Sequence, residues 1–297
     1  ALLRATRPEG LLERDQPRAA VAAEGLRALI PSLSGPQAGP IIPNELYTKV
    51  YVWDEAAGHY VEDPGQTGPA TGVRFVLYAI DPFTEQPASP LNPVGYADLL
   101  DESAGNTLQL HLLVKNTAGT VTYVDYTAAV TPGTGSFGAT VSGYLANGQA
   151  GAARRLDFDI AFSASETQTG ADISADATFD LANSSVSFEI HDDAHFAGNT
   201  WTFTRDFRFH RPGEVVTVQG EIVITETAPE TFTINGQIDV RINGGLFVRI
   251  TITNGEVTVN RELSEQEQLV MLHLLEALDD VWDSIEDFFD PLDLFVG

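Results

Sequence analysis

Apolar and polar residues alternate along most of the second half of this chain, from Leu156 to Val259. The clearest runs are Leu156, Phe158, Ile160 and Phe162, and then Trp201, Phe203, Phe207 and Phe209. Because successive side chains of a β-strand point to opposite faces, a period of two places each set on one face. Such alternation is typical of antiparallel sheets packed on one face and solvated on the other. The sequence therefore predicts an all-β, mainly antiparallel fold: a large curved meander sheet, or a sandwich-like or barrel-like variant.

The second half of the chain is expected to contain eight strands. Their predicted ranges are 156–162, 173–181, 186–190, 201–209, 215–224, 232–242, 246–252 and 257–259. Two turns near the end carry strong hairpin signals, at 243–245 and at Asn254 with Gly255. Asparagine and glycine tolerate the positive φ angles that a type I′ turn requires. This half is therefore predicted to be a meander.

The first half is less regular. Residues 1–45 are expected to form an N-terminal helix, ended by Pro31, and a proline- and glycine-rich arm. In a first β region, 46–150, strands are predicted at 47–53, 60–61, 73–80, 108–114 and 121–130, with a long loop at 81–93 and a short alternating piece at 137–145. We place a domain boundary before a third region, 151–297. The alternative is one continuous domain over both β regions.

A capping box formed by Ser264 and Glu267 begins a predicted C-terminal helix that runs toward Asp290. Its apolar stripe comprises Leu274, Leu275, Leu278, Val281, Trp282, Ile285, Phe288 and Phe289. Because an apolar stripe of this size has to be buried, we expect this amphipathic helix to pack on the apolar face of the sheet. Another subunit is the alternative partner.

Charge and composition exclude several classes of function. The chain has 42 acidic and 16 basic residues, a net charge of −26, so it repels nucleic acid and anionic membrane surfaces. Its apolar runs are shorter than the roughly 18 residues of a membrane span. It contains no cysteine, which rules out disulfides, thiolate metal sites and thiol nucleophiles. We therefore expect no nucleic acid partner and no membrane span.

The densest set of possible metal ligands is His191, Asp193 and His195. Imidazole and carboxylate groups can chelate a divalent ion from a tight loop, and the sequence places these residues in a hairpin turn between Ile190 and Trp201. Polar side chains are also what any exposed turn carries. We therefore predict no metal site, and keep these three residues as weak candidates for one.

A second acidic group is expected on one strand face. Asp172, Asp176 and Asp180 lie four residues apart, and Asp157 and Asp159 fall on a neighbouring strand. Stacked carboxylates can hold calcium, which takes six to eight oxygen ligands, but the chain lacks the spacing of an EF-hand. We predict no cofactor, with calcium as the alternative.

Catalytic motifs are missing from the sequence. The Gly-x-Ser-x-Gly elbow, the His-Glu-x-x-His zinc motif and the phosphate-binding loop do not occur. We therefore predict no catalytic and no cofactor-binding residues, and expect that the protein is not an enzyme. Aromatic residues of the first β region offer a surface for stacking sugars: Tyr47, Tyr51, Trp53, Tyr60, Tyr78, Tyr123 and Tyr126.

The leading functional hypothesis is a structural one. The chain begins at Ala1 rather than Met, as cleavage of a signal peptide would leave it, and it is rich in short strands. We predict an exported, non-catalytic β-rich protein of an extracellular or cell-surface assembly, which associates with itself or with another surface protein through its terminal segments. The first alternative is a carrier that holds a lipid-like ligand between the sheet and the C-terminal helix. The second is a carbohydrate-binding module or glycosidase.

Overall fold

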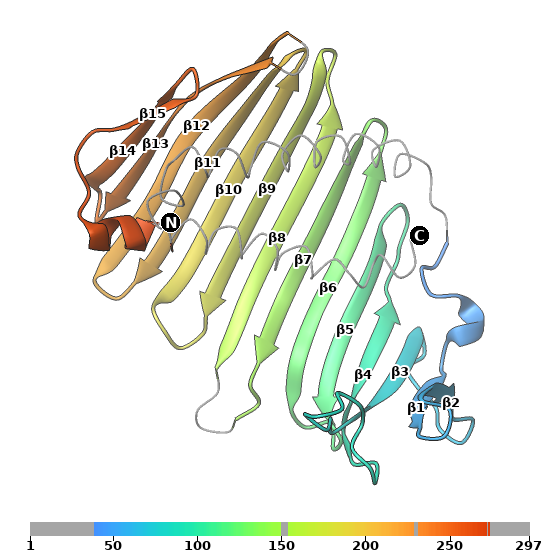
Figure 1. Ribbon diagram of the computed structural model, residues 1–297. Coiled ribbons are helices and arrows are strands. Elements are labelled where there is room, and N and C mark those ends of the chain that lie inside the picture. The colour runs from blue at the N-terminus through green and yellow to red at the C-terminus, as the bar shows by residue number, and fades with distance from the viewer. Residues whose placement is uncertain (1–38, 150–153, 229–230, 272, 274–297) are drawn as a thin grey trace.

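The computed structural model describes residues 39–149, 154–228, 231–271 and 273, and these residues form one sheet of 15 strands (Figure 1). The strands are β1 (Val50–Asp54), β2 (His59–Glu62), β3 (Gly72–Tyr78), β4 (Pro93–Asp101), β5 (Leu108–Asn116), β6 (Thr122–Gly133), β7 (Ser136–Ala146), β8 (Arg155–Glu166), β9 (Gly170–Leu181), β10 (Val186–Ala197), β11 (Thr200–Arg211), β12 (Glu214–Ala228), β13 (Thr231–Ile242), β14 (Gly245–Thr253) and β15 (Glu256–Val259). The prediction of an all-β, mainly antiparallel fold is confirmed.

The sheet is a meander from β3 to β15, in which each strand pairs with the next one in the chain. At the opposite end, β1 lies between β2 and β3 and pairs in parallel with β3, through Val50 beside Arg74 and Tyr51 beside Phe75. All eight strands predicted for the second half are present. One prediction for the first half is wrong, because it leaves out β4, which pairs with both β3 and β5.

Pairing continues across residue 150. The piece predicted at 137–145 is the full strand β7, which pairs along its length with β6 and β8, from Ser136 beside Ser165 to Ala146 beside Arg155. The hydrogen bonding between strands of the sheet therefore continues from one side of the predicted domain boundary to the other.

One face of the sheet carries the core. A row of neighbouring side chains crosses ten strands, and every member is buried: Leu110, Ala128, Val141, Ile160, Ala177, Ile190, Phe207, Val218, Val240 and Val248. In the adjacent row the rings of Phe179 and Phe188 stack at 4.4 Å between centroids. Burying one large apolar side chain contributes roughly 1.5 to 3 kcal/mol before entropy is subtracted. The alternation seen in the sequence is thus the division between core and solvent.

An ion pair interrupts the apolar face. Asp192 and Arg205 are direct neighbours on β10 and β11, in a row that also contains Ala175 and Gly220. The Nη2 of Arg205 donates to Asp192 at 2.8 Å, and its Nε donates to the same carboxylate. A charge placed on an apolar face needs such a partner. Position 205 of β11 therefore carries a charged side chain, although its nearest neighbours on this face of β11 are both phenylalanines.

The described chain packs onto the apolar face at both of its ends. Before β1, Ile42 is fully buried and its N–H donates to the carboxylate of Asp101. After β15, a short helix covers 265–271, and Met271 joins the main core. The rest of the predicted C-terminal helix and the predicted N-terminal helix lie outside the described residues.

The capping box predicted for the C-terminal helix is confirmed. The N–H of Ser264 donates to Glu267 at 2.8 Å, and the N–H of Glu267 donates to the Ser264 hydroxyl at 3.3 Å. Among the residues that the structure describes, no helix has the length and apolar character needed to cross a bilayer.

Candidate functional site on the polar face

The polar face of β8 to β11 gathers serine, aspartate and histidine side chains in three parallel rows. Strand pairing gives the rows Ser165–Asp172–His195–Thr202, Ser163–Ser174–Asp193–Thr204 and Ala161–Asp176–His191–Asp206. Direct neighbours on adjacent strands lie about 5 Å apart, so their side chains touch. All the predicted metal-ligand candidates lie in this group.

His191 is held between carboxylates. Its Nδ1 hydrogen-bonds to Asp176 of β9, and its Nε2 lies 3.0 Å from Asp193 of its own strand. Asp206 is its neighbour on β11. The hydrogen bond to Asp176, with the charge of Asp193, raises the pKa of His191 against a smaller opposing effect of burial. The ring therefore binds its proton more tightly than an unperturbed imidazole does, and it bridges the two acids.

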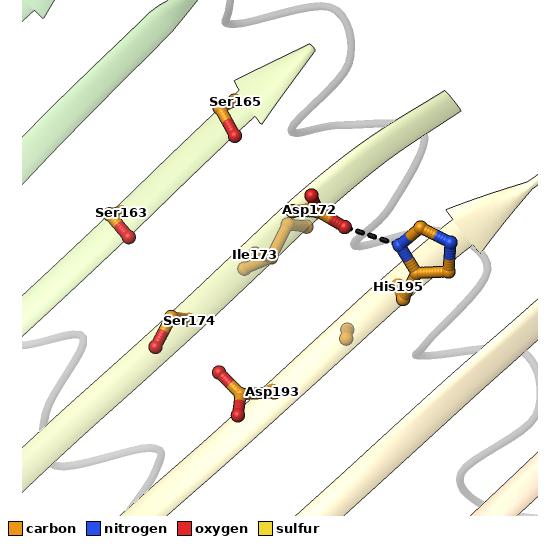
Figure 2. Close-up of a pocket in the computed structure, with 8 residues that line it drawn as sticks. Ser163, Ser165, Asp172, Ile173, Ser174, Asp193 and His195 are labelled. Carbon is orange, nitrogen blue, oxygen red and sulfur yellow. Dashed lines mark hydrogen bonds and ion pairs between the residues drawn. The ribbon is translucent and has the colours of Figure 1, made fainter. Parts of the chain in front are cut away.

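Two open depressions lie over these rows. The first is lined by Ser163, Ser165, Asp172, Ser174, Asp193 and His195, and Figure 2 shows His195 of β10 bonded to Asp172 of β9. The second is lined by Asp176, Thr178, Glu189, His191, Asp206 and Arg208. Both are floored by the sheet itself and present hydroxyl, carboxylate and imidazole groups to solvent.

The arrangement does not form a nucleophilic triad. Ser165, Asp172 and His195 are in one row, but Asp172 lies in the middle. A serine nucleophile needs the imidazole between the hydroxyl and the carboxylate. Here Ser165 and His195 are two strands apart, roughly 10 Å, and the ring of His195 bonds to Asp172. The geometry instead suits cross-strand ion pairing.

The placement of His191, Asp193 and His195 in a hairpin turn is wrong. They lie inside β10, where each of them pairs with both β9 and β11, and the turn comes later, at Gly198 and Asn199. His191 and His195 are about 13 Å apart along the strand, and each ring turns sideways to a different aspartate of β9. Within the described ranges, no three histidine or acidic side chains converge as a metal site would require.

The acidic residues considered for calcium do share the polar face. Asp157 and Asp180 are direct neighbours on β8 and β9. Several of these carboxylates already have hydrogen-bond partners: Asp157 bonds to Arg155, Asp172 to His195 and Asp176 to His191. Calcium binding stays the alternative to the prediction of no cofactor, and it would have to displace these partners.

The aromatic residues near β1 pack against one another on the sheet. Tyr51 stacks on Phe75 at 5.2 Å, and Tyr60 meets both Trp53 and Phe75 edge to face. The Tyr60 hydroxyl donates to the carbonyl of Val76 at 2.9 Å. Such contacts are typical of packing, and they occupy ring faces that a sugar would need. Carbohydrate binding stays a prediction.

Sequence reasoning missed further charged groups of this face, because their partners lie on other strands. His111 of β5 lies 3.0 Å from Glu102 and 2.8 Å from Asp125. Burial lowers its pKa, but the two carboxylates outweigh this effect, so the pKa of His111 is raised. Arg74 forms a two-pronged ion pair with Asp98 at 2.6 and 2.7 Å. Pairing across strands therefore recurs along this face.

A second feature missed from the sequence is where apolar side chains are exposed. In the described residues the exposed large apolar side chains are Ile80, Phe83 and Val94 near the β3–β4 connection, and Phe232, Ile242, Leu246, Val259, Leu269 and Val270 on β13 to β15 and the short helix. These two groups lie near opposite ends of the sheet (Figure 1). We call the first group, which includes the connection at 79–92, the β3–β4 end of the sheet. We call the second group the β15 end.

No protein-family model matches this chain, and comparisons with curated proteins and with solved structures find no match.

Proposed function

We propose that this protein is a non-catalytic, β-rich structural protein that associates with itself as a subunit of an extracellular or cell-surface assembly. The observation that carries the proposal is the gathering of exposed large apolar side chains at the two ends of the sheet, with the strands from β5 to β12 contributing none among the described residues. Concentrated exposed apolar surface is typical of interaction sites on proteins.

The polar face supports a non-catalytic role. Its ionisable side chains pair with one another across strands, and about half of the His191 and His195 side-chain surface stays exposed. Charged interactions at such positions are screened by water, whereas catalytic groups act in enclosed, water-poor sites. The two depressions are therefore better explained as gaps between paired side chains than as reaction sites.

The oligomeric state of the full chain tests this proposal. Sedimentation velocity over a wide concentration range, with electron microscopy of the same material, should show concentration-dependent association into ordered species. A protein that stays monomeric at high concentration, with no ordered polymer, would contradict it. Fractionation of the source cells tests export separately, and recovery of the protein in the cytosol alone would count against it.

A carrier of a lipid-like ligand is the second candidate, favoured by the apolar face of the sheet. The buried row across ten strands is long enough to lie along an extended acyl chain. Native mass spectrometry of gently purified protein should then show a bound species that organic extraction removes. Mass equal to that of the bare chain under all conditions would reject this role.

A further inference from the structure

We propose that residues 274–289 of this chain dock on the apolar face of its own sheet, as a helix that crosses the middle strands. These residues lie outside the described part of the chain. Of the two partners expected for the C-terminal apolar stripe, the structure favours the sheet of the same chain over another subunit. The docked segment is independent of self-association, because it involves the face of the sheet and not its two ends.

The middle of the apolar face is buried more completely than one sheet layer allows. Val141, Ile160 and Ile190 lie on β7, β8 and β10 and are 0%, 2% and 3% exposed. Side chains on neighbouring strands flank these residues, but they leave the side that faces away from the sheet open to solvent. A sheet face is buried only by a second layer packed on it. The middle strands are therefore covered.

The cover comes from the ends of this chain. The structure consists of one chain, so the burial of these residues is produced within that chain. The described residues outside the strands that join the main core come before β1 and after β15, at the two ends of the sheet: Ile41, Ile42, Leu46, Tyr47, Leu263 and Met271. The gaps at 150–153 and 229–230 are too short to reach the middle of the face. Residues 1–38 and 274–297 are left as the source of the cover.

The short helix fixes the side of the C-terminal segment that meets the sheet. Met271 is buried in the main core, whereas His273 is exposed. An α-helix repeats about every 3.6 residues, so positions about one, two, three, four and five turns after Met271 return to its side. Large apolar residues occupy these positions: Leu274, Leu275, Leu278, Trp282, Ile285 and Phe289. Acidic residues flank or oppose this side, at 279, 280, 283, 286, 287 and 290. The stripe therefore continues from Met271 without a change of phase, which selects this segment over residues 1–38.

The segment also has the length to reach the middle strands. The short helix lies at the β15 end, where the Nε of Arg261 donates to the carbonyl of Phe247 of β14 at 2.7 Å (Figure 1). A helix over 265–290 is about 39 Å long at about 1.5 Å per residue. Strands lie about 4.8 Å apart, so this length spans about eight of them, from β14 to β7. At the far end of the face the chain around Ile42 already provides cover.

A single introduced thiol tests this cover, because the chain has no cysteine of its own. Ala177→Cys places the thiol on β9, at a position that is 1% exposed. It should react slowly with a small thiol reagent. Adding Leu278→Asp and Trp282→Asp puts charges into the stripe and should raise the labelling rate on the order of tenfold or more. The matched control adds His273→Asp and Ser284→Asp, which lie away from the stripe, and should leave the rate nearly unchanged.

A cross-link gives a second reading that does not depend on how the stripe variant folds. A photoreactive benzophenone side chain in place of Trp282 should cross-link to β7 to β11 of the same chain, at a concentration where single chains predominate. Cross-links to residues 1–38 alone, cross-links only between copies, or none to the sheet would overturn the proposal. Equal labelling of folded stripe and control variants would overturn it as well. Hydrogen exchange of the β8 to β11 amides shows whether each variant is folded, and if the stripe variant is unfolded the cross-link decides.

The proposed function and the docked segment fail separately in these experiments. A protein that gives the intramolecular cross-links but stays monomeric at every concentration would contradict the proposed function and leave the docked segment standing. A protein that associates but gives no such cross-link would do the reverse. Native mass spectrometry of the same samples detects a bound lipid, and a lipid whose extraction alone exposes the thiol at 177 would overturn the proposal.

Discussion

At the scale of single residues, two histidines of the polar face each bridge two acids: His191 lies between Asp176 and Asp193, and His111 between Glu102 and Asp125. The pKa of His191 is raised, first by its hydrogen bond to Asp176. A raised pKa means that the folded state binds the proton more tightly than the unfolded state does. The resulting stabilisation is fully present below the ordinary value of 6.5 and is lost as the pH rises through the raised value.

We therefore expect His191→Gln to lower the free energy of unfolding by about 0.5 kcal/mol at about pH 6, and to have almost no effect at about pH 9. The magnitude is small because the pair is half exposed and screened. Urea unfolding at the two pH values measures it. His210→Gln is the control: His210 lies on the same face of β11, and its Nδ1 faces the carbonyl of Ser185. If both variants showed the same pH dependence of stability, the bridge from His191 to Asp176 would not be the cause of that dependence.

Gly143 is a residue whose replacement should disturb the sheet directly. It has φ +154°, and a Cβ there would lie 2.2 Å from the carbonyl oxygen of Asp125 and 2.4 Å from the Cβ of Tyr126. The rings of Tyr126 and Phe158, its neighbours in the row, meet at 5.8 Å. We expect Gly143→Ala to cost on the order of 2 to 4 kcal/mol in urea unfolding.

The control for this substitution is in the same strand. At Gly138 an added Cβ meets only the carbonyl oxygen of Phe162, at 3.9 Å. Gly138→Ala should therefore change the unfolding free energy by well under about 1 kcal/mol. If the two alanine variants were equally stable, the close approach at Gly143 would not constrain the fold.

At the scale of elements, alternation predicts a strand well but its ends poorly. β4 was not predicted because proline and glycine, here Pro93 and Gly95, are unusual in strands. In the structure Pro93 is the first residue of its strand. At Gly95 a Cβ would come 2.2 Å from the carbonyl oxygen of Lys115, so a glycine fits there. β10 was predicted to end at Ile190 because the polar residues after it resemble a turn. Partners on both adjacent strands keep that segment extended.

The junction between β15 and the short helix depends on Glu267. The pKa of Glu267 is lowered to about 2, first by its hydrogen bonds from Arg261 and then by the N–H of Ser264. Its contribution is therefore present above the ordinary value of 4.5 and is lost as the pH falls toward about 2. Arg261 in turn covers the Phe247 carbonyl and stacks 4.4 Å from the Phe247 ring.

We expect Glu267→Gln to speed hydrogen exchange of the amides of 264–268 at neutral pH, because the helix start loses its charged cap. Ser264→Ala should act in the same direction, at a cost of about 1 kcal/mol to the local structure. Glu265→Gln, an exposed neighbour in the same turn, is the control. Unchanged exchange in both cap variants would mean that the junction is held by other contacts.

At the scale of the whole molecule, the described sheet behaves as a one-dimensional array, because each strand is hydrogen-bonded only to its neighbours in the order. In such arrays opening begins at the ends and stability accumulates toward the middle. We expect ladder amides of β8 to β11 to exchange more slowly than those of β2 and β15, on the order of tenfold or more. Hydrogen exchange with mass spectrometry measures this.

The same experiment tests the domain boundary at residue 150. Two independent domains would show a minimum of protection at β7 and β8, where one continuous domain shows a plateau. Uniform protection from β2 to β15 would contradict the array description, since it requires all strands to open together.

The sequence by itself determined which residues face the core, because the period of two is a local property that strand geometry converts directly into faces. It placed Phe158 and Ile160 inside and Asp157 outside without knowledge of any partner. Only the tertiary structure decided which side chains meet, such as Asp176 with His191 and Asp192 with Arg205. It also decided that Phe83 is exposed to solvent. Those contacts depend on strand order and register, where one residue of slip changes every neighbour.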